Sequence, residues 1–380
     1  MNNQCLDSYN TTFGTCLAMR EYHEEQAKNS QWNHCRVSDL SVEPLDRSSP
    51  LYSMPGAFAD GISLEAVQDT ADNLGLALHM GGSIYPVRQT AYKSLLERAK
   101  ISGSGLTKLS KNELAQVLNT FLKHFSSEAL VLVRDEKISA VHSGDVSDYS
   151  VLPIDELLAA LQKKLDERFP GNVFSAGYTD HAITSAAWEL PNQKEELLGT
   201  YAELLKAQGK TKMADKLMPG IRFMTSDTGV ASAKVSALLM GVQHPIHIGG
   251  CIAVDHRHQS KVSDFDSALD QLFAQFTTSV ESLRKLLDIE LEYPLNAMTR
   301  VCKKLSMPKK AAVEAISMYE MAYGGGGATA HDVFLAMQEI PFIMKTSGAP
   351  QSKLLTLEET MARALTLRWS DYDLAKAVEY

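Results

Sequence analysis

Three extended apolar segments follow one another between residues 219 and 258, and this stretch constrains the fold of the 380-residue chain more than any other. They read IRFMTS, SAKVSALLM and PIHIGGCIAV, and a Ser-Asp-Thr-Gly turn separates the first two. Short apolar runs bounded by Gly, Ser and Asp are typical of β-strands. We therefore expect residues 219–258 to contribute three extended segments to a sheet.

Two pairs of apolar runs precede this stretch. ALVLVRDEKISAVHS has an apolar run on each side of Asp135-Glu136-Lys137, which is the pattern of a β-hairpin. NVFSAGYTDHAITSAAWEL has the same pattern and is expected to turn near residues 178–180. Periodic spacing of apolar residues predicts helices over residues 90–100, 111–125, 153–169 and 193–208.

The pattern is mostly helical beyond residue 260. Residues 262–290 are expected to form a long helix, and Pro294, Pro308 and Pro341 divide the remainder into shorter helices. Gly324–Gly327 is expected to be a flexible joint between two of them. The predicted fold class is α+β, with mixed or antiparallel sheet elements, flanking helices and a mostly helical C-terminal third. We expect an N-terminal helix and irregular arm over residues 1–60, an α+β core domain over 61–260 and a helical region over 261–380.

Composition limits the classes of function. Acidic residues outnumber basic ones by 46 to 37, and the formal net charge is −9. This disfavours a general nucleic-acid coat, because such binding comes from neutralising phosphates, but it is compatible with a local basic groove on an acidic body. The five cysteines include no C-x-x-C pair, which favours a reducing, cytoplasmic setting over a disulfide framework. Neither a signal peptide nor a membrane-spanning segment is expected.

Histidines are most concentrated between residues 244 and 258. Side chains alternate along a strand, so His247, Cys251 and Asp255 would share one face of an extended segment. Such residues suit Zn²⁺ or Fe²⁺, but residues four apart on a regular strand lie about 13 Å apart, too far for one ion. We therefore predict no metal and no other cofactor. The candidate ligands, should a metal bind, are His247, Cys251, Asp255, His256 and His258.

The segment Thr-Ser-Asp-Thr-Gly at residues 225–229 has two interpretations. Its hydroxyl and N–H groups could contact a phosphate or a base. The alternative, which the residues alone favour, is an Asx-type turn that links two strands.

Common catalytic motifs are missing from the sequence. It contains no G-x-S-x-G elbow, no H-E-x-x-H pair and no zinc-deaminase signature. Gly324–Gly327 lacks the Gly-Lys-Ser/Thr end of a phosphate-binding loop. These observations disfavour a common hydrolase or metalloenzyme.

Basic residues cluster in two places. Six lie within residues 88–111, and four lie within residues 303–310, near Arg300. Aromatic side chains such as Tyr178 and Trp188 could stack on bases, as they do in proteins that bind single strands. The alternative for each basic cluster is a solvated helix face.

The order of several short motifs resembles that of a known family. The motifs are YPVRQTAYKSLL, LVRDEKISAVHSGDVSDYSVLPIDELLAAL, PGIRFMTSDTGVASAKV and TAHDVFLAMQEI. Over about residues 80–340 they are similar to the phage/plasmid-like protein family of unknown function, numbered nine hundred and thirty-two among such domains. The positions that carry the resemblance are Arg134, Ala140, Ser143, Tyr149, Ile154, Asp155, Ser226, Asp227, Gly229, Thr329, Asp332 and Val333. One departure is clear: family members often carry a Cys-x-Asn-Gly segment after the Ser-acid-x-Gly turn, and here the nearest piece is HIGGCIAVDH.

The resemblance implies an intracellular protein of phage or plasmid biology with a role in DNA metabolism. Together with the basic clusters, it leads us to expect a non-enzymatic protein that binds single-stranded nucleic acid as a homo-oligomer, in recombination or annealing. The candidate nucleic-acid contacts are Lys93, Arg98, Arg134, Tyr178, Trp188, Arg222, Ser226, Asp227, Thr228, Gly229, Lys303 and Lys304. Two alternatives stay open: a metal-dependent or nucleotide-acting enzyme centred on residues 226–258, and an assembly or anti-defence protein that binds another protein through its helical C-terminal third.

Overall fold

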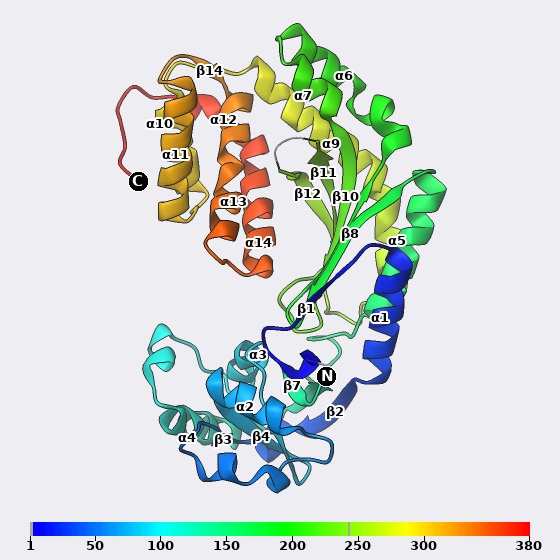
Figure 1. Ribbon diagram of the computed structural model, residues 1–380, viewed down its shortest axis with the longest axis vertical. Helices are drawn as coiled ribbons and strands as arrows, with labels where there is room; N and C mark the ends of the chain where they lie inside the picture. Colours follow the sequence, from blue (N-terminus) through cyan, green and yellow to red (C-terminus); the bar gives the residue numbers. More distant parts are fainter. Residues whose placement is uncertain (1–2, 242–243) are drawn as a thin grey trace.

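The computed structural model describes residues 3–241 and 244–380 and confirms an α+β fold with antiparallel sheets and a largely helical C-terminal region (Figure 1). Its largest sheet has six antiparallel strands in the order β1-β8-β9-β10-β11-β12. The strands are β1 (Asn10–Phe13), β8 (Val173–Asp180), β9 (Thr184–Glu189), β10 (Met218–Thr225), β11 (Ala233–Met240) and β12 (Ile246–Val254). The three extended segments predicted within residues 219–258 are therefore present as neighbouring strands.

Two smaller antiparallel sheets lie in the lower part of Figure 1, which we call the lower lobe (residues 31–143). One contains β2 (Gln31–Arg36), β6 (Glu128–Arg134) and β7 (Lys137–Ser143), and the other contains β3 (Ser41–Pro44), β4 (Leu76–Met80) and β5 (Ser83–Pro86). The hairpin predicted around residues 135–137 is β6–β7. The second predicted hairpin is β8–β9, but it turns at residues 181–183, because β8 continues to Asp180.

Helices cover both faces of the six-stranded sheet. Ile221 and Phe223 of β10 are buried on one face, where Phe223 packs against Phe265 of α8 (Val262–Ala268). Arg222, between them, points to the other face and pairs with Glu358 of α14 (Gln351–Ala362). Figure 1 shows α14 and α9 on opposite sides of the sheet. The helices on the buried face include α5 (Ile154–Arg168), α6 (Lys194–Ala207), α8 (Val262–Ala268) and α9 (Leu272–Lys285).

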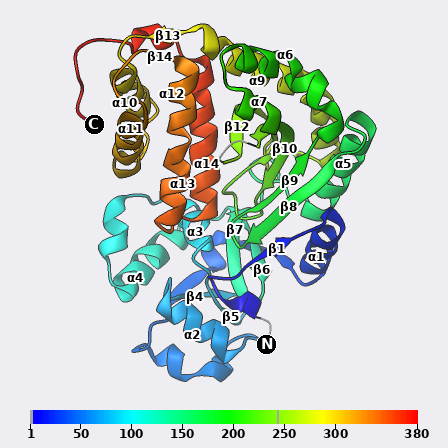
Figure 2. The same cartoon turned by 45° about the horizontal axis from the view of Figure 1, so that its top comes forward.

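Proline sets the start of two C-terminal helices. Pro294 occupies the first turn of α10 (Pro294–Lys304), and Pro308 directly precedes α11 (Lys309–Tyr323). Pro341 lies inside α13 (Glu339–Thr346), after α12 (Ala330–Met337), so it divides no helices. The long helix predicted over residues 262–290 is instead α8 and α9, joined by a short 3-10 turn where Asp270 accepts a hydrogen bond from Lys164 of α5. Figures 1 and 2 both show α12, α13 and α14 as a layer between the sheet and the α10–α11 pair.

Side-chain caps begin several helices. Ser110 forms a capping box with Glu113, and Thr329 forms one with Asp332. The remaining helices are α1 (Cys16–Lys28), α2 (Leu64–Asp72), α3 (Ala91–Arg98), α4 (Lys111–Leu122) and α7 (Thr211–Lys216). Gly324–Gly327 joins α11 to β14 (Ala328–Thr329), which pairs with β13 (Glu290–Leu291). In residues 3–241 and 244–380, no helix is long and apolar enough to cross a membrane.

The two largest clusters of buried hydrophobic residues divide near residue 145. The larger one combines part of α1 with residues 152–369, and the second is formed by residues 37–141. The boundary predicted at residue 260 falls inside the larger cluster, because Phe265 of α8 packs edge-on against Phe223 of β10. The first 60 residues do not form a separate arm, since β1, β2 and β3 each join a different sheet.

Candidate nucleic-acid interface

The turn at residues 225–229 joins β10 to β11 and is buried. The Ser226 hydroxyl closes it, because it accepts hydrogen bonds from the N–H groups of Thr228 and Val230, both at 3.2 Å, and donates one to the Ala182 carbonyl at 2.5 Å. Each residue from Thr225 to Thr228 is less than a tenth exposed. These polar groups are satisfied within the protein, which supports a turn that links two strands and does not support a surface that contacts nucleic acid.

Arg134 and Asp227, both predicted to contact nucleic acid, bind each other. Their ion pair has a 2.7 Å distance between Nη2 and Oδ2, and both side chains are largely buried. The Nε group of Arg134 also donates to the Ser30 hydroxyl at 2.8 Å. The pair therefore joins the β6–β7 hairpin of the lower lobe to the β10–β11 turn, and its charges already neutralise each other.

A column of aromatic rings packs beside this ion pair. The rings of His142 and Tyr149 are parallel within 6°, with centroids 3.6 Å apart, and His256 stacks on Tyr149 at 5.7 Å. Both the His142 ring, at 2.8 Å, and the Tyr149 hydroxyl, at 2.9 Å, donate to the Asp227 carbonyl. Gly229 follows with a φ of 73°, and a Cβ atom there would lie 3.3 Å from the His142 ring. The residues of this stretch are thus part of the packing between the lower lobe and the sheet.

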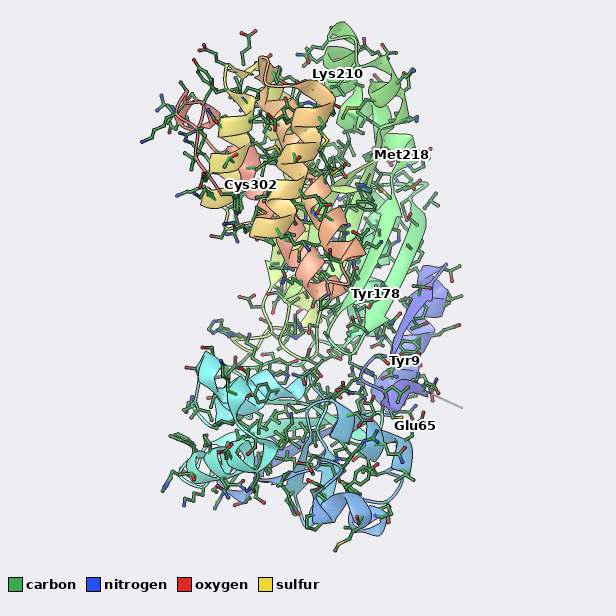
Figure 3. The ribbon with its side chains drawn as sticks, turned by 60° about the vertical axis from the view of Figure 1, so that its left-hand side comes forward. Tyr9, Glu65, Tyr178, Lys210, Met218 and Cys302 are labelled. Atoms are coloured by element: carbon green, nitrogen blue, oxygen red, sulfur yellow. The ribbon has the colours of Figure 1, made fainter. Side chains whose placement is uncertain are left out.

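A polar cavity of about 20 Å³ lies at the same junction, near Tyr9, which Figure 3 labels between the two parts of the molecule. This volume holds about one water molecule and is too small for a base. Burial lowers the pKa of two lining side chains, His23 to about 4 and His181 to about 2, so both are neutral at pH 7. The junction is a packed polar interface with no room for a nucleotide.

Sequence reasoning missed a second group of charged residues at this junction. The side chains of Arg88 and Lys137 are completely buried, and Asp7 and Asp69 bind them. Lys137 lies 3.1 Å from Asp7 and also pairs with Asp69, whereas Arg88 donates to the Leu6 carbonyl at 3.2 Å. Arg88 is one of the six basic residues of the first cluster, and its burial removes it from the surface. The four charged residues come from four separate segments, so no local pattern revealed the group.

The spacing predicted for His247 and Cys251 is wrong. Their side chains lie 3.8 Å apart, measured from Nε2 to Sγ, whereas a regular strand would separate the residues by about 13 Å. The reason is a β-bulge: the register between β11 and β12 shifts after Ser236, which leaves Gly249 and Gly250 as extra residues.

Neither side chain of the His247–Cys251 pair is charged at pH 7. Burial raises the pKa of the Cys251 thiol to about 11 and lowers that of His247 to about 3, so both groups are neutral at pH 7. Of the other candidate ligands, Asp255 accepts a hydrogen bond from a serine, His256 belongs to the aromatic column and His258 is exposed. The described part of the chain contains no group of three or more His, Cys, Asp or Glu side chains that could hold a metal ion.

Replacing Gly249 with alanine is expected to lower the free energy of unfolding by about 2–3 kcal/mol. Gly249 has a φ of 73°, and an added Cβ atom would lie 1.9 Å from Oγ and 2.6 Å from Cβ of Ser279 on α9. The matched control is Gly209→Ala, because Gly209 has a φ of 77° with no atom within 4 Å of the added Cβ. Urea denaturation of both variants separates the close contact from the cost of positive φ, and equal losses would contradict the role of the close contact.

Three of the predicted aromatic and basic contacts have polar partners within the protein. Trp188 is completely buried and donates its indole N–H to Gln162 at 2.9 Å, so neither ring face is open to a base. Arg222 is held by Glu358 of α14. Tyr178, labelled in Figure 3, is half-buried and donates its hydroxyl to Asp180 at 2.8 Å.

Three of the predicted contacts are exposed lysines at helix surfaces. Lys93 lies on α3, and Lys303 and Lys304 lie in the last turn of α10. Arg98, at the end of α3, is half-buried, and burial lowers its pKa. Further exposed lysines extend both sites, so we define an α3–α4 surface by Lys93, Lys100 and Lys108, and an α10–α11 surface by Lys303, Lys304, Lys309 and Lys310.

The helices that carry the two surfaces lie on the same side of the molecule. Figure 1 shows α3 and α4 on the lower lobe and α10 and α11 above them, and the turned view of Figure 3 brings both groups forward together. The structure thus places the helices of the two basic clusters on one side, whereas it directs Arg134, Arg222 and the Ser226–Gly229 turn into internal contacts.

Comparisons with known proteins give no match, since no family model, no curated protein and no solved structure is similar to this chain. The resemblance to the phage/plasmid-like family therefore stays a prediction that rests on the sequence motifs.

Proposed function

We propose that the protein binds single-stranded nucleic acid through the α3–α4 and α10–α11 surfaces, without catalysing a reaction on it. The observation that carries the proposal is the local charge. Residues 294–310 contain five basic residues and no acidic one, and residues 91–125 contain six basic and two acidic residues, in a chain of net charge −9. Exposed lysines grouped in this way give an acidic protein local sites of positive potential, and phosphate neutralisation supplies the affinity for nucleic acid.

Most of these lysines are available to bind phosphate. Among the residues that the structure describes, no carboxylate lies within ion-pair distance of Lys304, Lys309 or Lys310 on one surface, or of Lys100 or Lys108 on the other. The proposed interface therefore keeps the exposed lysines predicted from sequence and leaves out the buried turn. The motif order shared with the phage/plasmid-like family supports a role in the DNA metabolism of mobile elements.

The proposal predicts that reversing charge on either surface weakens binding. We expect at least a tenfold lower affinity for a labelled single-stranded oligonucleotide at about 100 mM salt. The negative slope of log K against log salt should become shallower by about 2, because each of the three lost phosphate contacts contributes about 0.7. Fluorescence anisotropy titrations measure both quantities. Two triple variants make the changes: K93E/K100E/K108E and K304E/K309E/K310E.

The matched control changes the net charge equally at exposed lysines outside both surfaces. It is the triple variant K163E/K212E/K216E. This control should lose little affinity, because long-range charge is screened over about 10 Å at 0.1 M salt. The proposal is wrong if the wild-type protein does not bind at low salt, where phosphate-driven affinity is strongest, or if the control weakens binding as much as the two surface variants.

A further inference from the structure

The segment of residues 373–380 lies along α10 and is held at both ends of this helix. The Asp373 carboxylate accepts hydrogen bonds from the N–H groups of Glu292, at 2.8 Å, and Tyr293, at 2.6 Å, directly before the helix begins. At the other end, the Tyr380 hydroxyl donates to the carbonyl of Met307 at 2.5 Å, beyond the last turn of α10. The segment therefore spans the whole helix.

Three polar side chains of α10 bind the middle of the segment through its backbone. Asn296 donates to two successive carbonyls at 3.0 and 3.1 Å, Arg300 to the carbonyl of Lys376 at 2.5 Å and Lys303 to that of Glu379 at 2.5 Å. Asn296, Arg300 and Lys303 are four and three residues apart, so they lie on one face of the helix. Because every acceptor is a main-chain carbonyl, this face of α10 recognises an extended peptide backbone.

The segment itself is weakly packed. Residues 374–377 and Glu379 are exposed, and only Asp373, Val378 and Tyr380 are partly buried. The docked segment nevertheless accepts hydrogen bonds from Arg300 and Lys303, which are two of the five basic residues between residues 294 and 310. Each N–H group that is bonded to a carbonyl is not available to a phosphate oxygen, so the docked segment leaves only the remaining donors of Arg300 and Lys303 to nucleic acid.

We propose that this face of α10 is a docking site for an extended peptide segment, that residues 373–380 occupy it in the free protein, and that a nucleic-acid strand displaces them. The inference rests on the proposed function and adds a regulatory step to it. Displacement is favourable because a phosphate places a full negative charge beside the cationic side chains of Arg300 and Lys303, whereas a main-chain carbonyl offers only a partial charge. Release of the segment frees the bonded donors of Lys303, which already belongs to the α10–α11 surface, and adds Arg300 to that surface.

The test uses D373A/Y380A, which removes both anchors of the segment. We expect this variant to bind a labelled single-stranded oligonucleotide about three- to tenfold more tightly than the wild-type protein. In the variant, the oligonucleotide no longer competes with the docked segment for α10. The matched control is D371A/L374A, which changes the charge equally at two exposed residues and keeps both anchors. Circular dichroism verifies that both variants fold.

A second readout does not depend on affinity. Trypsin cleavage after Lys376, followed by mass spectrometry, reports release of the segment. Cleavage should be several-fold faster in D373A/Y380A than in D371A/L374A, and it should accelerate in the wild-type protein when the oligonucleotide is added. Equal affinities, or cleavage of wild-type protein that the oligonucleotide leaves unchanged, would overturn the inference and leave the proposed function standing. A lack of binding by wild-type protein and by D373A/Y380A would overturn the proposed function, and the inference with it.

Discussion

Replacing Asp69 with alanine is expected to lower the free energy of unfolding by about 3–5 kcal/mol. Asp69 is a carboxylate partner of Lys137, whose side chain is completely buried, and it also accepts a hydrogen bond from the Asp7 N–H group at 2.9 Å. Without Asp69, Lys137 keeps only Asp7, at 3.1 Å, and Asp7 also pairs with the buried Arg88. Two buried cations would then share one carboxylate, and an uncompensated buried charge costs several kcal/mol.

The matched control is Asp72→Ala, which removes a carboxylate three residues along the same helix. Asp72 pairs with Arg47 at 2.8 Å, but both side chains are at least half exposed, and such pairs contribute about 0–1 kcal/mol. Urea denaturation of the two variants compares the losses directly. Adding Lys137→Met to Asp69→Ala should recover part of the stability, because it removes the unpaired charge. A loss for Asp69→Ala no larger than for Asp72→Ala would show that Lys137 does not depend on this carboxylate.

The helices and strands that could be predicted from the sequence are those that neighbouring residues in the chain specify. The β6–β7 hairpin follows from two apolar runs on either side of a polar turn, and Asp135 and Glu136 adopt the positive φ values that this two-residue turn needs. Ser110 and Thr329 begin helices because the acidic residue three positions later completes a capping box. Each of these signals lies within a few residues of the structure it specifies.

The candidate site was harder to predict because its contacts join distant segments. Arg134 and Asp227 are 93 residues apart, and nothing near either residue indicates that they neutralise each other. Ser226 offers the same hydroxyl to a ligand or to its own turn, so the residue types could not distinguish the two roles. The distance between His247 and Cys251 depends on a bulge, which a regular alternation of side chains does not reveal. What could be predicted was the exposed lysines, because an unpaired lysine on a helix surface needs no distant partner.

Lowering the pH from 7 to about 5 is expected to lower the free energy of unfolding by several kcal/mol. Five histidines are buried and His181 is half-buried. Loss of water around the ring lowers the pKa to about 4 for His23, His142 and His331, to about 3 for His247 and to about 2 for His181, and it also lowers the pKa of His256. The ordinary pKa is about 6.5, so below that pH the unfolded chain binds protons that the folded chain does not. The contribution of these neutral histidines to the free energy of unfolding is therefore fully present above about pH 6.5. It falls as the pH is lowered, until the pH reaches the pKa values of the histidines in the folded protein. Each histidine contributes a slope of up to about 1.4 kcal/mol per pH unit, and a typical domain has only about 5–15 kcal/mol to lose.

The contribution of one buried histidine can be isolated with His142→Gln. Glutamine can still donate a hydrogen bond to the Asp227 carbonyl, which the His142 ring binds at 2.8 Å, but it binds no proton in this pH range. The variant starts less stable at pH 7, since it loses the stacking of His142 on Tyr149. Its free energy of unfolding should nevertheless fall less steeply between pH 6.5 and 4, by about 1.4 kcal/mol per pH unit. His124→Gln is the control, because His124 is exposed, and its curve should run parallel to that of the wild-type protein. Parallel curves for all three proteins would mean that protonation of His142 does not oppose folding.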